Sequence, residues 1–576
     1  MRNLNVKMLI VALVASLSIW AQDTVLVKEV VVSQEFNPTV NDAFKISTSP
    51  KMDKPTSYSP NFEYQFFNFP LRTSYHIQPL KAESYLPSER PQVSQQNYVK
   101  GGFGNYSTLM GELFYNAYQS KDQNVNIFYR NRSSWGDVRL QDDRKVDAPL
   151  LSNYGRVEFQ KRYRYAVLNS SVVFKRKAYE FYGYHPLDLS LDYVYADSTA
   201  LALETGKQSL TNIGFDIELK SLERRGSDLD YSVGLAFNSL SNDDKFSENQ
   251  FDITGLVQKS LDKLEVGIDA AINAGFYGDA DVSTTRQYMG DPYYNIELAP
   301  FMAFEQKNWD LKLGAKFELY QMGPIQEMLP APVLDFNFDI VPKYFKVYIQ
   351  ANGDMKQNTY AQVTQLNPFV ANDIVRKPTR KALDVAAGIV GHPTSSLSMT
   401  LGVNYQIIKD QLFFVNEMVD GGDPATAGMN YTNRFVAEYD DNNLLAFHGE
   451  LNYNNYKQWS ASAAFDYYSY DLANLPEAWN LPEYKISLYG HYDVTERILL
   501  KGTFEFMPER AVKVSQSNDV DYTPVTYDLS MSGEYKFRDN LSFFADLNNI
   551  LGSKYYYFNG YPAYRLNVLL GATFRF

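Results

Sequence analysis

The residue types that most often carry catalysis or bind metals are scarce in this chain of 576 residues. It has no cysteine, which excludes thiol nucleophiles, disulfides and cysteine-ligated zinc or iron–sulfur sites. Its five histidines lie far apart, without the HExxH or HxH spacing that places two rings on one metal: His76, His185, His392, His448 and His491. We expect His448 and His491 to lie in solvent, on the polar faces of strands.

Other motifs for nucleophilic, phosphate or calcium chemistry are also missing. There is no GxSxG or GxxxxGK[ST] sequence, and GGDPATAG at 421–428 lacks the lysine, so its glycines are better explained by turns. The pairs Asp279 with Asp281 and Asp440 with Asp441 offer oxygen ligands for calcium, but ordinary turn chemistry explains them better. We predict that the chain is not an enzyme and binds no cofactor or metal.

Composition limits the partners. Lys and Arg number 54 against 67 Asp and Glu, giving a net charge of −13 with no basic block, which argues against nucleic-acid binding. The chain is rich in aromatic residues, with 45 Tyr, 37 Phe and 5 Trp.

The N-terminus has the pattern of an export signal. Arg2 and Lys7 precede the apolar stretch Met8 to Trp20, which is too short for the roughly 20 residues of a membrane-spanning helix. We predict that residues 1–22 form a cleaved signal peptide. The mature protein is then either soluble and exported or a closed β-barrel.

From Tyr98 to Phe576 the hydropathy alternates with period two. Between Val525 and Phe537, apolar and polar residues occupy opposite faces, and Trp309 to Leu319 repeats the pattern. We count about 22 such segments, an even number that leaves both ends of a barrel on the same side. The alternative, a soluble sandwich, propeller or solenoid, fits less well because the segments are long and no internal repeat is evident.

The connections between these segments alternate in length. Tight turns at 306–309, 342–345, 495–497 and 538–540 alternate with long connections at 185–206, 358–378, 418–432 and 471–482. The sequence therefore predicts an all-β fold: a transmembrane antiparallel β-barrel of about 22 strands at residues 98–576, with short periplasmic turns and long extracellular loops. Outer-membrane lipid is then an obligatory partner.

Two features of side-chain chemistry follow from this interpretation. A group of rings around one predicted loop is expected to form an outer girdle at the headgroup level: Tyr555, Tyr556, Tyr557, Phe558, Tyr561 and Tyr564. The polar faces carry more acids than bases, which predicts a mildly acidic lumen: Glu218, Glu265, Asp269, Asp335, Asp339 and Glu505, interspersed with Lys316, Lys501 and Lys536.

The C-terminus carries a resemblance to a known family. Residues from Tyr564 to Phe576 alternate and end on an aromatic residue, which resembles the signal that outer-membrane barrels present to the barrel-assembly machinery; Tyr564, Phe574 and Phe576 would carry it. The stretch from Asp546, DLNNILGSKYYYFNGYPAYRLNVLLGATFRF, resembles the closing hairpin of TonB-dependent receptors.

That resemblance extends to the start of the mature chain. TVLVKEVVVSQ, from Thr24 to Gln34, is similar to a Ton box, which is offered as an added strand to a TonB-like coupling protein. Its β-branched residues, Val25, Val27, Val30, Val31 and Val32, would bind that partner.

The plug domain that the family carries inside its barrel has no counterpart. Residues 23–96 hold 8 of the 25 prolines, so we interpret 23–97 as a Pro-rich periplasmic tether without a folded plug. The tether, inward-folded loops or an unidentified plugging or surface protein would then have to occlude the lumen.

Two functions remain open at this point. The resemblance implies transport of a solute across the outer membrane of a Gram-negative bacterium, with the tether and the C-terminus in the periplasm. The alternative is a plugless envelope scaffold or assembly factor that binds other outer-membrane or periplasmic proteins.

Overall fold

The computed structural model describes residues 97–184, 207–222, 229–243, 246–261, 263–278, 291–371, 374–418, 431–455, 458–515 and 518–576. The predicted signal peptide, the tether up to residue 96 and its Ton-box-like valines lie outside these residues, as do GGDPATAG and the pair Asp279 and Asp281.

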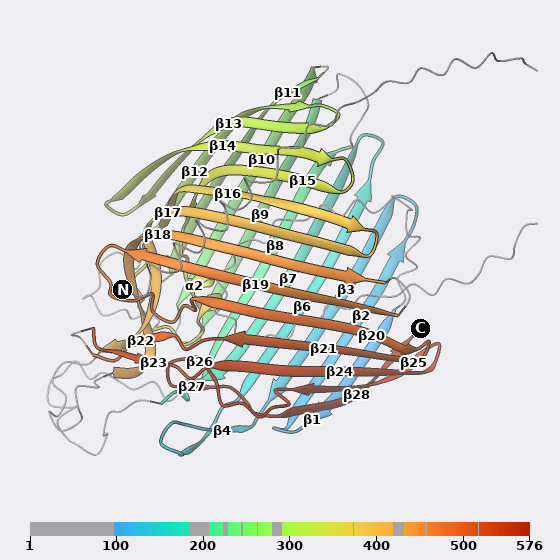
Figure 1. Cartoon of the computed structure of the whole chain (residues 1–576), viewed down its shortest axis with the longest axis vertical. Coiled ribbons are helices and arrows are strands. Elements are labelled where there is room, and N and C mark those ends of the chain that lie inside the picture. Colours follow the sequence, from blue (N-terminus) through green and yellow to red (C-terminus); the bar gives the residue numbers. More distant parts are fainter. Residues whose placement is uncertain are drawn as a thin grey trace, which may run out of the picture. The chain divides into compact units, whose positions relative to one another are not determined.

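Twenty-two strands form one closed antiparallel barrel (Figure 1). The ring closes because the first strand pairs with the last, from Tyr98 opposite Arg575 to Gly104 opposite Leu569. The first half comprises β1 (Tyr98–Gly104), β2 (Thr108–Gln119), β3 (Gln123–Ser134), β6 (Leu150–Arg162), β7 (Ala166–Glu180), β8 (Lys207–Ser221), β9 (Leu229–Asn242), β10 (Ser247–Leu261), β11 (Leu264–Gly278), β12 (Tyr293–Glu305) and β13 (Trp309–Met322). The second half comprises β14 (Ile325–Val341), β15 (Phe345–Lys356), β16 (Thr379–Thr394), β17 (Leu397–Met418), β18 (Tyr431–Asn454), β19 (Trp459–Leu472), β20 (Tyr484–Thr495), β21 (Ile498–Met507), β24 (Thr526–Arg538), β25 (Leu541–Asn548) and β28 (Asn567–Arg575). The predicted fold class is confirmed.

Small elements lie in the connections. Three short hairpins pair β4 (Asp137–Arg139) with β5 (Lys145–Asp147), β22 (Ala511–Lys513) with β23 (Val520–Tyr522), and β26 (Tyr556–Phe558) with β27 (Tyr561–Pro562). The helix α2 (Tyr360–Leu366) lies within the predicted long connection 358–378.

No helix in the described part of the chain is long and apolar enough to cross a membrane.

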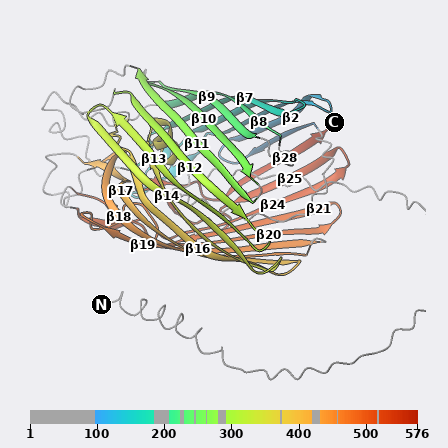
Figure 2. The ribbon, with the colours of Figure 1, turned by 90° about the horizontal axis from the view of Figure 1, so that it is seen from above.

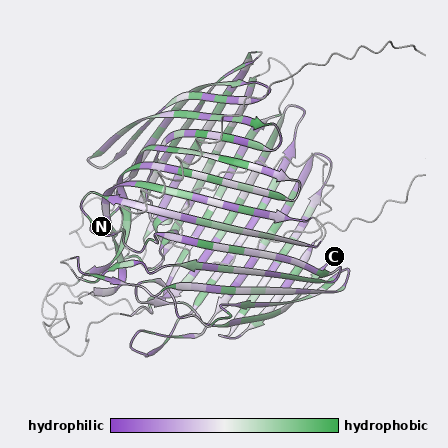
Figure 3. Ribbon diagram, viewed as in Figure 1, coloured by the Kyte–Doolittle hydropathy of each residue, from purple (hydrophilic) through white to green (hydrophobic). Residues whose placement is uncertain are grey.

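The period-two pattern separates an apolar outer face from a polar inner face. On β13, Leu313, Phe317 and Leu319 are 40 to 50% exposed, while Lys316 and Glu318 point to the other side, with only 13% and 1% of their side chains exposed. Figure 3 shows the same alternation of hydrophobic and hydrophilic residues along most strands. Such a band of exposed apolar side chains suits contact with lipid.

The two ends of the barrel differ, as predicted from the connection lengths. Turns such as 306–308, 342–344 and 539–540 gather at one end, which we call the short-turn end. The connections that contain α2 and the three hairpins lie at the other, which we call the loop end (Figure 1). Figure 2 shows the barrel from above, with the C-terminus beside β28 and β25. The amide of Phe576 donates to the carbonyl of Asn97 at 2.9 Å, so the C-terminus and the start of β1 share the short-turn end.

The C-terminal aromatic residues divide between two environments. Phe574 and Phe576 lie on the outer face, 47% and 57% exposed. Tyr564 precedes β28; its ring stacks on Tyr106 with centroids 4.5 Å apart, and its hydroxyl donates to the carbonyl of Ala148. The regular outer face of the last segment therefore begins after Tyr564.

The predicted outer girdle is wrong for the rings around this loop. Tyr555, Tyr556, Phe558 and Tyr561 are at most 7% exposed and pack inside the loop end. Burial against other aromatic side chains removes more apolar surface from water than a headgroup position does, so these rings fold inward.

Candidate functional site: a lid across the loop end

The connection between β15 and β16 crosses the loop end, and we call its described residues, 357–371 and 374–378, the lid. Its contacts reach strands that are far apart in the ring. β7 is the fifth barrel strand and β18 the sixteenth, so in a ring of 22 they lie on opposite walls.

On the β18 wall the lid is held by backbone hydrogen bonds. Val370 forms a parallel bridge with Phe435. The amide of Ala371 donates to the carbonyl of Phe435 at 2.8 Å, and the amide of Phe435 donates to the carbonyl of Phe369 at 2.9 Å. These bonds give the lid the character of a short added strand at this point.

On the β7 wall the lid is held by a side chain. The hydroxyl of Tyr179 donates to the carbonyl of Pro368, and its ring meets Phe369 edge-on with centroids 5.6 Å apart. Because Pro368, Phe369 and Val370 are consecutive, these few residues connect the two walls.

A hydrophobic cluster surrounds this crossing. Phe369 stacks on Tyr561 with centroids 3.7 Å apart. The other members come from β7, β8, β9, β17 and β18, from the residues next to β7 and β10, from the lid itself and from the last loop: Tyr179, Phe181, Leu210, Leu240, Phe246, Tyr360, Val363, Val370, Ile374, Leu412, Phe435 and Phe558. Complete burial of one such side chain stabilises a fold by about 1.5–3 kcal/mol, so this cluster is the main force that closes the lid.

A charged contact on β10 forms a third attachment. The carboxylate of Glu248 accepts hydrogen bonds from the amides of Tyr360 at 2.6 Å and Ala361 at 3.3 Å, at the start of α2. The Arg376 guanidinium lies 3.8 Å from that carboxylate and 3.7 Å from the ring centre of Tyr277. The Glu248 and Arg376 side chains are 0% and 3% exposed, so the pair is withdrawn from water.

The neighbouring loops are joined to one another by buried and half-buried polar groups. Glu438 on β18 accepts hydrogen bonds from the Trp479 indole at 3.1 Å and from Lys513. Arg510 donates to the carbonyls of Tyr556 and Tyr557, and its burial lowers its pKa to about 10, so it stays charged at neutral pH. The loop after β19, the loop after β21 and the last loop thus form one connected surface.

The pair Asp440 and Asp441, considered as calcium ligands, forms structural contacts instead. Asp440 accepts hydrogen bonds from the amides of Asn474 and Leu475, both at 2.8 Å, and Asp441 accepts one from Lys409 at 2.6 Å. In the described residues no three His, Cys, Asp or Glu side chains gather as they would around a metal ion.

The two histidines expected on polar faces lie beside carboxylates. His448 Nδ1 is 2.7 Å from Asp466, and His491 Nε2 is 3.3 Å from Asp493. Each lies on the inner face of its strand, as predicted. Leu451 on the strand of His448 and Tyr492 on the strand of His491 are exposed on the outer face, and each is an odd number of positions from the histidine, so the two side chains point to opposite faces.

Several inner-face acids are paired with lysines. Lys312 is 3.5 Å from Asp269, and Lys316 is 3.4 Å from Glu297. Pairing of this kind weakens the acidic field that the composition of the polar faces predicts.

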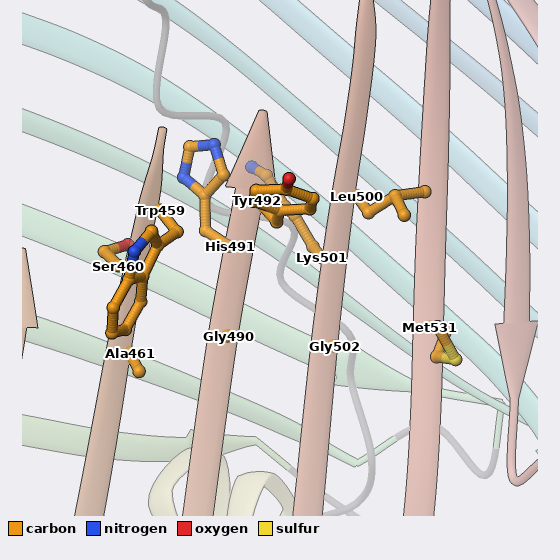
Figure 4. Close-up of a pocket in the computed structure, with 10 residues that line it drawn as sticks. All are labelled: Trp459, Ser460, Ala461, Gly490, His491, Tyr492, Leu500, Lys501, Gly502 and Met531. Carbon is orange, nitrogen blue, oxygen red and sulfur yellow. The ribbon is translucent and has the colours of Figure 1, made fainter. Parts of the chain in front are cut away.

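The outer wall carries a separate hollow of about 560 Å³ over β19, β20, β21 and β24 (Figure 4). Gly490 and Gly502 are register partners there, and a Cβ added to Gly490 would meet no atom within 4 Å. Trp459 and Tyr492 line it and are 42% and 45% exposed, so the hollow faces the lipid side. His491 and Lys501 contribute backbone atoms to the hollow, because their side chains point to the inner face of the barrel.

Comparison with known proteins identifies the fold. No protein-family model matches the sequence, and no curated protein matches it. Among solved structures, the barrel is similar to the ferric-catecholate import receptor Fiu from E. coli K12, with 10% identity and a TM-score of 0.59 over 84% of this chain and 82% of that one. It is also similar to the FrpB iron transporter from Neisseria meningitidis (8% identity, TM-score 0.61, 84% and 81% covered) and to the copper transporter OprC (11%, 0.60, 83% and 80%). At this identity the likeness shows the fold alone: a closed antiparallel barrel of 22 strands, similar to the barrels of TonB-dependent receptors.

Proposed function

We propose that the protein transports a solute across the outer membrane of a Gram-negative bacterium, and that the lid controls entry from the loop end. The observation that carries the proposal is the attachment of three consecutive lid residues, Pro368 to Val370, to opposite walls of the barrel. The barrel's likeness to structures named as an import receptor, an iron transporter and a copper transporter supports it.

In this proposal the short-turn end faces the periplasm. The tether would then leave the barrel on the side where a TonB-like protein could bind Val25, Val27 and Val30 to Val32 as an added strand. The barrel-assembly machinery would recognise the C-terminal strand chiefly through Phe574 and Phe576, because these two are exposed on the outer face.

The alternative remains an envelope scaffold or assembly factor. It is favoured by the loop surface itself: the buried Arg510 and the half-buried Glu438 fix several loops to one another, and a fixed surface suits binding of another envelope protein.

The test is single-channel conductance in planar bilayers. It compares the mature protein, a variant without residues 23–96, a variant with residues 360–371 replaced by a Gly-Ser linker of equal length, and a variant with both changes. The matched control replaces residues 140–145 in the β4–β5 hairpin by the same kind of linker, because that segment also lies at the loop end but does not cross the barrel.

If the protein is a transporter, the variant with both changes should form large steady channels. Its conductance should exceed that of the variant without residues 23–96 alone, because the lid has also been removed. The hairpin control should conduct as the mature protein does. If the double variant also stays closed and a second protein co-purifies in stoichiometric amount, transport is wrong and the scaffold function replaces it.

A further inference from the structure

Four basic side chains occupy adjacent strands of the inner wall near the loop end. On β3, β6 and β7, residues that lie directly opposite one another form two rows. The first row consists of Arg130, Tyr154 and Lys175, and the second consists of Arg132, Ser152 and Lys177. We call Arg130, Arg132, Lys175 and Lys177 the basic wall.

The alternation of side chains along each strand places these basic residues on the inner face. Tyr129 on β3, Val157 on β6 and Phe174 on β7 are 42%, 44% and 37% exposed and form the apolar outer face. The basic residues have the opposite parity, since side chains alternate along a strand. The four cations therefore share the lumen with the hydroxyl groups of Tyr154 and Ser152.

The cations are close enough to act on one ligand. Neighbouring strands are roughly 4.8 Å apart and alternate residues on a strand roughly 6.7 Å apart, so the four positions mark a patch of roughly 10 by 7 Å. A lysine or arginine side chain spans much of that distance, so groups from both rows can reach the same small molecule.

Basic side chains outnumber the acids at this patch, where Asp546 attracts Arg132 and Glu112 pairs with Arg130. Glu112 on β2 lies opposite Arg130, which it contacts at 2.6 Å, and it also accepts a hydrogen bond from Tyr98 at 2.6 Å. Within the described residues, neither Lys175 nor Lys177 forms an ion pair. The basic wall is thus an exception to the mildly acidic lumen that the charged residues on the polar faces of the strands predict.

The basic wall lies directly beneath the lid. Tyr179, the next inward residue after Lys177 on β7, donates its hydroxyl to the lid carbonyl of Pro368. Its register partner on β6, Leu150, packs against the hydrophobic cluster. A ligand on the basic wall would therefore be separated from the loop end by the aromatic contacts of the lid.

We propose that the basic wall binds an anionic solute that carries phosphate or carboxylate groups. Clustered cations repel one another, and an anion with several charged oxygens relieves that repulsion and accepts charge-assisted hydrogen bonds from them. This inference rests on the proposed function only in taking the bound solute to be the one transported; the site itself requires no transport.

The test is equilibrium binding of inorganic tripolyphosphate to the mature full-length protein in detergent, measured by titration calorimetry at low and high salt. We expect one saturable site per chain whose affinity falls as salt rises. The double variant Lys175→Gln, Lys177→Gln should bind about tenfold or more weakly, because it removes two of the charged donors.

Two variants keep the test specific. Lys175→Arg, Lys177→Arg retains the charges and should bind within about threefold of the unchanged protein. Lys485→Gln, Lys501→Gln removes two inner-face lysines from β20 and β21 and should have little effect. Folding of each variant is checked by its migration in unheated gels.

The proposal is wrong if the unchanged protein does not bind the probe, if the β20–β21 pair weakens binding as much as the β7 pair, or if the arginine pair binds as poorly as the glutamine pair. Binding without any conductance in the lid and tether variants would keep this site and reject transport. Conductance without binding of the probe would keep transport and reject the anion site.

Discussion

At the scale of single residues, the contact between Glu248 and Arg376 fixes where the start of α2 attaches to the barrel wall. Removing two charges from water is costly, and the attraction between them offsets that cost only when hydrogen bonds complete the arrangement. Here the amides of Tyr360 and Ala361 supply those bonds to Glu248. The pair therefore specifies where the lid attaches more than it adds to overall stability.

Glu248→Gln should loosen the lid while leaving the ring of 22 strands intact. The substitution keeps the size of the side chain but leaves Arg376 as a buried charge without its carboxylate, which typically costs about 3–5 kcal/mol. We expect amide hydrogen exchange at residues 360–371 to accelerate about a hundredfold or more, since about 1.4 kcal/mol corresponds to a factor of ten.

The matched control is Glu265→Gln, which neutralises a half-buried carboxylate at the other end of the neighbouring strand β11. Exchange in the lid should not change in that variant. Equal acceleration in both variants, or unchanged exchange in Glu248→Gln, would show that the hydrophobic cluster holds the lid without help from the ion pair.

At the scale of elements, local alternation predicted the strands but could not predict the lid. Period-two patterning depends on neighbours in sequence, so the strands around Val525 and Trp309 were readable. The helix α2 also had a readable signal: Thr359 and Gln362 form the capping box of its first turn. The attachment of that helix to Glu248, 112 residues away, could not be read, because no local pattern encodes it.

The inward-folded aromatic loop and the basic wall illustrate the same limit. A tyrosine near a strand end has the same sequence pattern whether it meets headgroups or folds over the lumen. Tyr561 folds inward because its hydroxyl finds the carbonyl of Asn433, 128 residues earlier. Alternation places Lys175 and Lys177 on one face, but only the register with β6 and β3 brings them beside Arg130 and Arg132.

Two glycine substitutions test how tightly the barrel wall is packed at two different places. A Cβ at Gly490 would enter the outer hollow without meeting an atom within 4 Å, whereas a Cβ at Gly104 would overlap the carbonyl oxygen of Val568 across the seam between β1 and β28. Gly490→Ala should therefore raise stability by about 0.5–1 kcal/mol, because alanine loses less conformational freedom on folding. Gly104→Ala should lower it.

The measurement is the temperature at which the folded band disappears in gels of samples heated in detergent. We expect a small rise for Gly490→Ala and a clear fall for Gly104→Ala. If Gly104→Ala melted at the same temperature as the unchanged protein, the seam would have to accommodate a methyl group that the structure leaves no room for.

At the scale of the whole molecule, the unequal ends of the barrel determine how it sits in a membrane. Both the start of β1 and the C-terminus lie at the short-turn end, joined by the hydrogen bond from Phe576 to Asn97. Barrels of this kind keep their short turns in the periplasm and expose their longer loops. The lid and the basic wall would then face solutes arriving from outside the cell.

Cysteine labelling can test that orientation without background, because the chain has no cysteine. Lys145→Cys places a thiol in the β4–β5 hairpin at the loop end, where the native side chain is 65% exposed, and loses a solvent-exposed contact with Asp137 that contributes little to stability. Asp539→Cys places one in the turn between β24 and β25 at the short-turn end, where the native side chain is fully exposed. In intact cells a membrane-impermeant maleimide should label Lys145→Cys rapidly and leave Asp539→Cys unlabelled until the outer membrane is permeabilised. The opposite pattern would turn the barrel over, put the lid in the periplasm and make its closure a control on exit rather than entry.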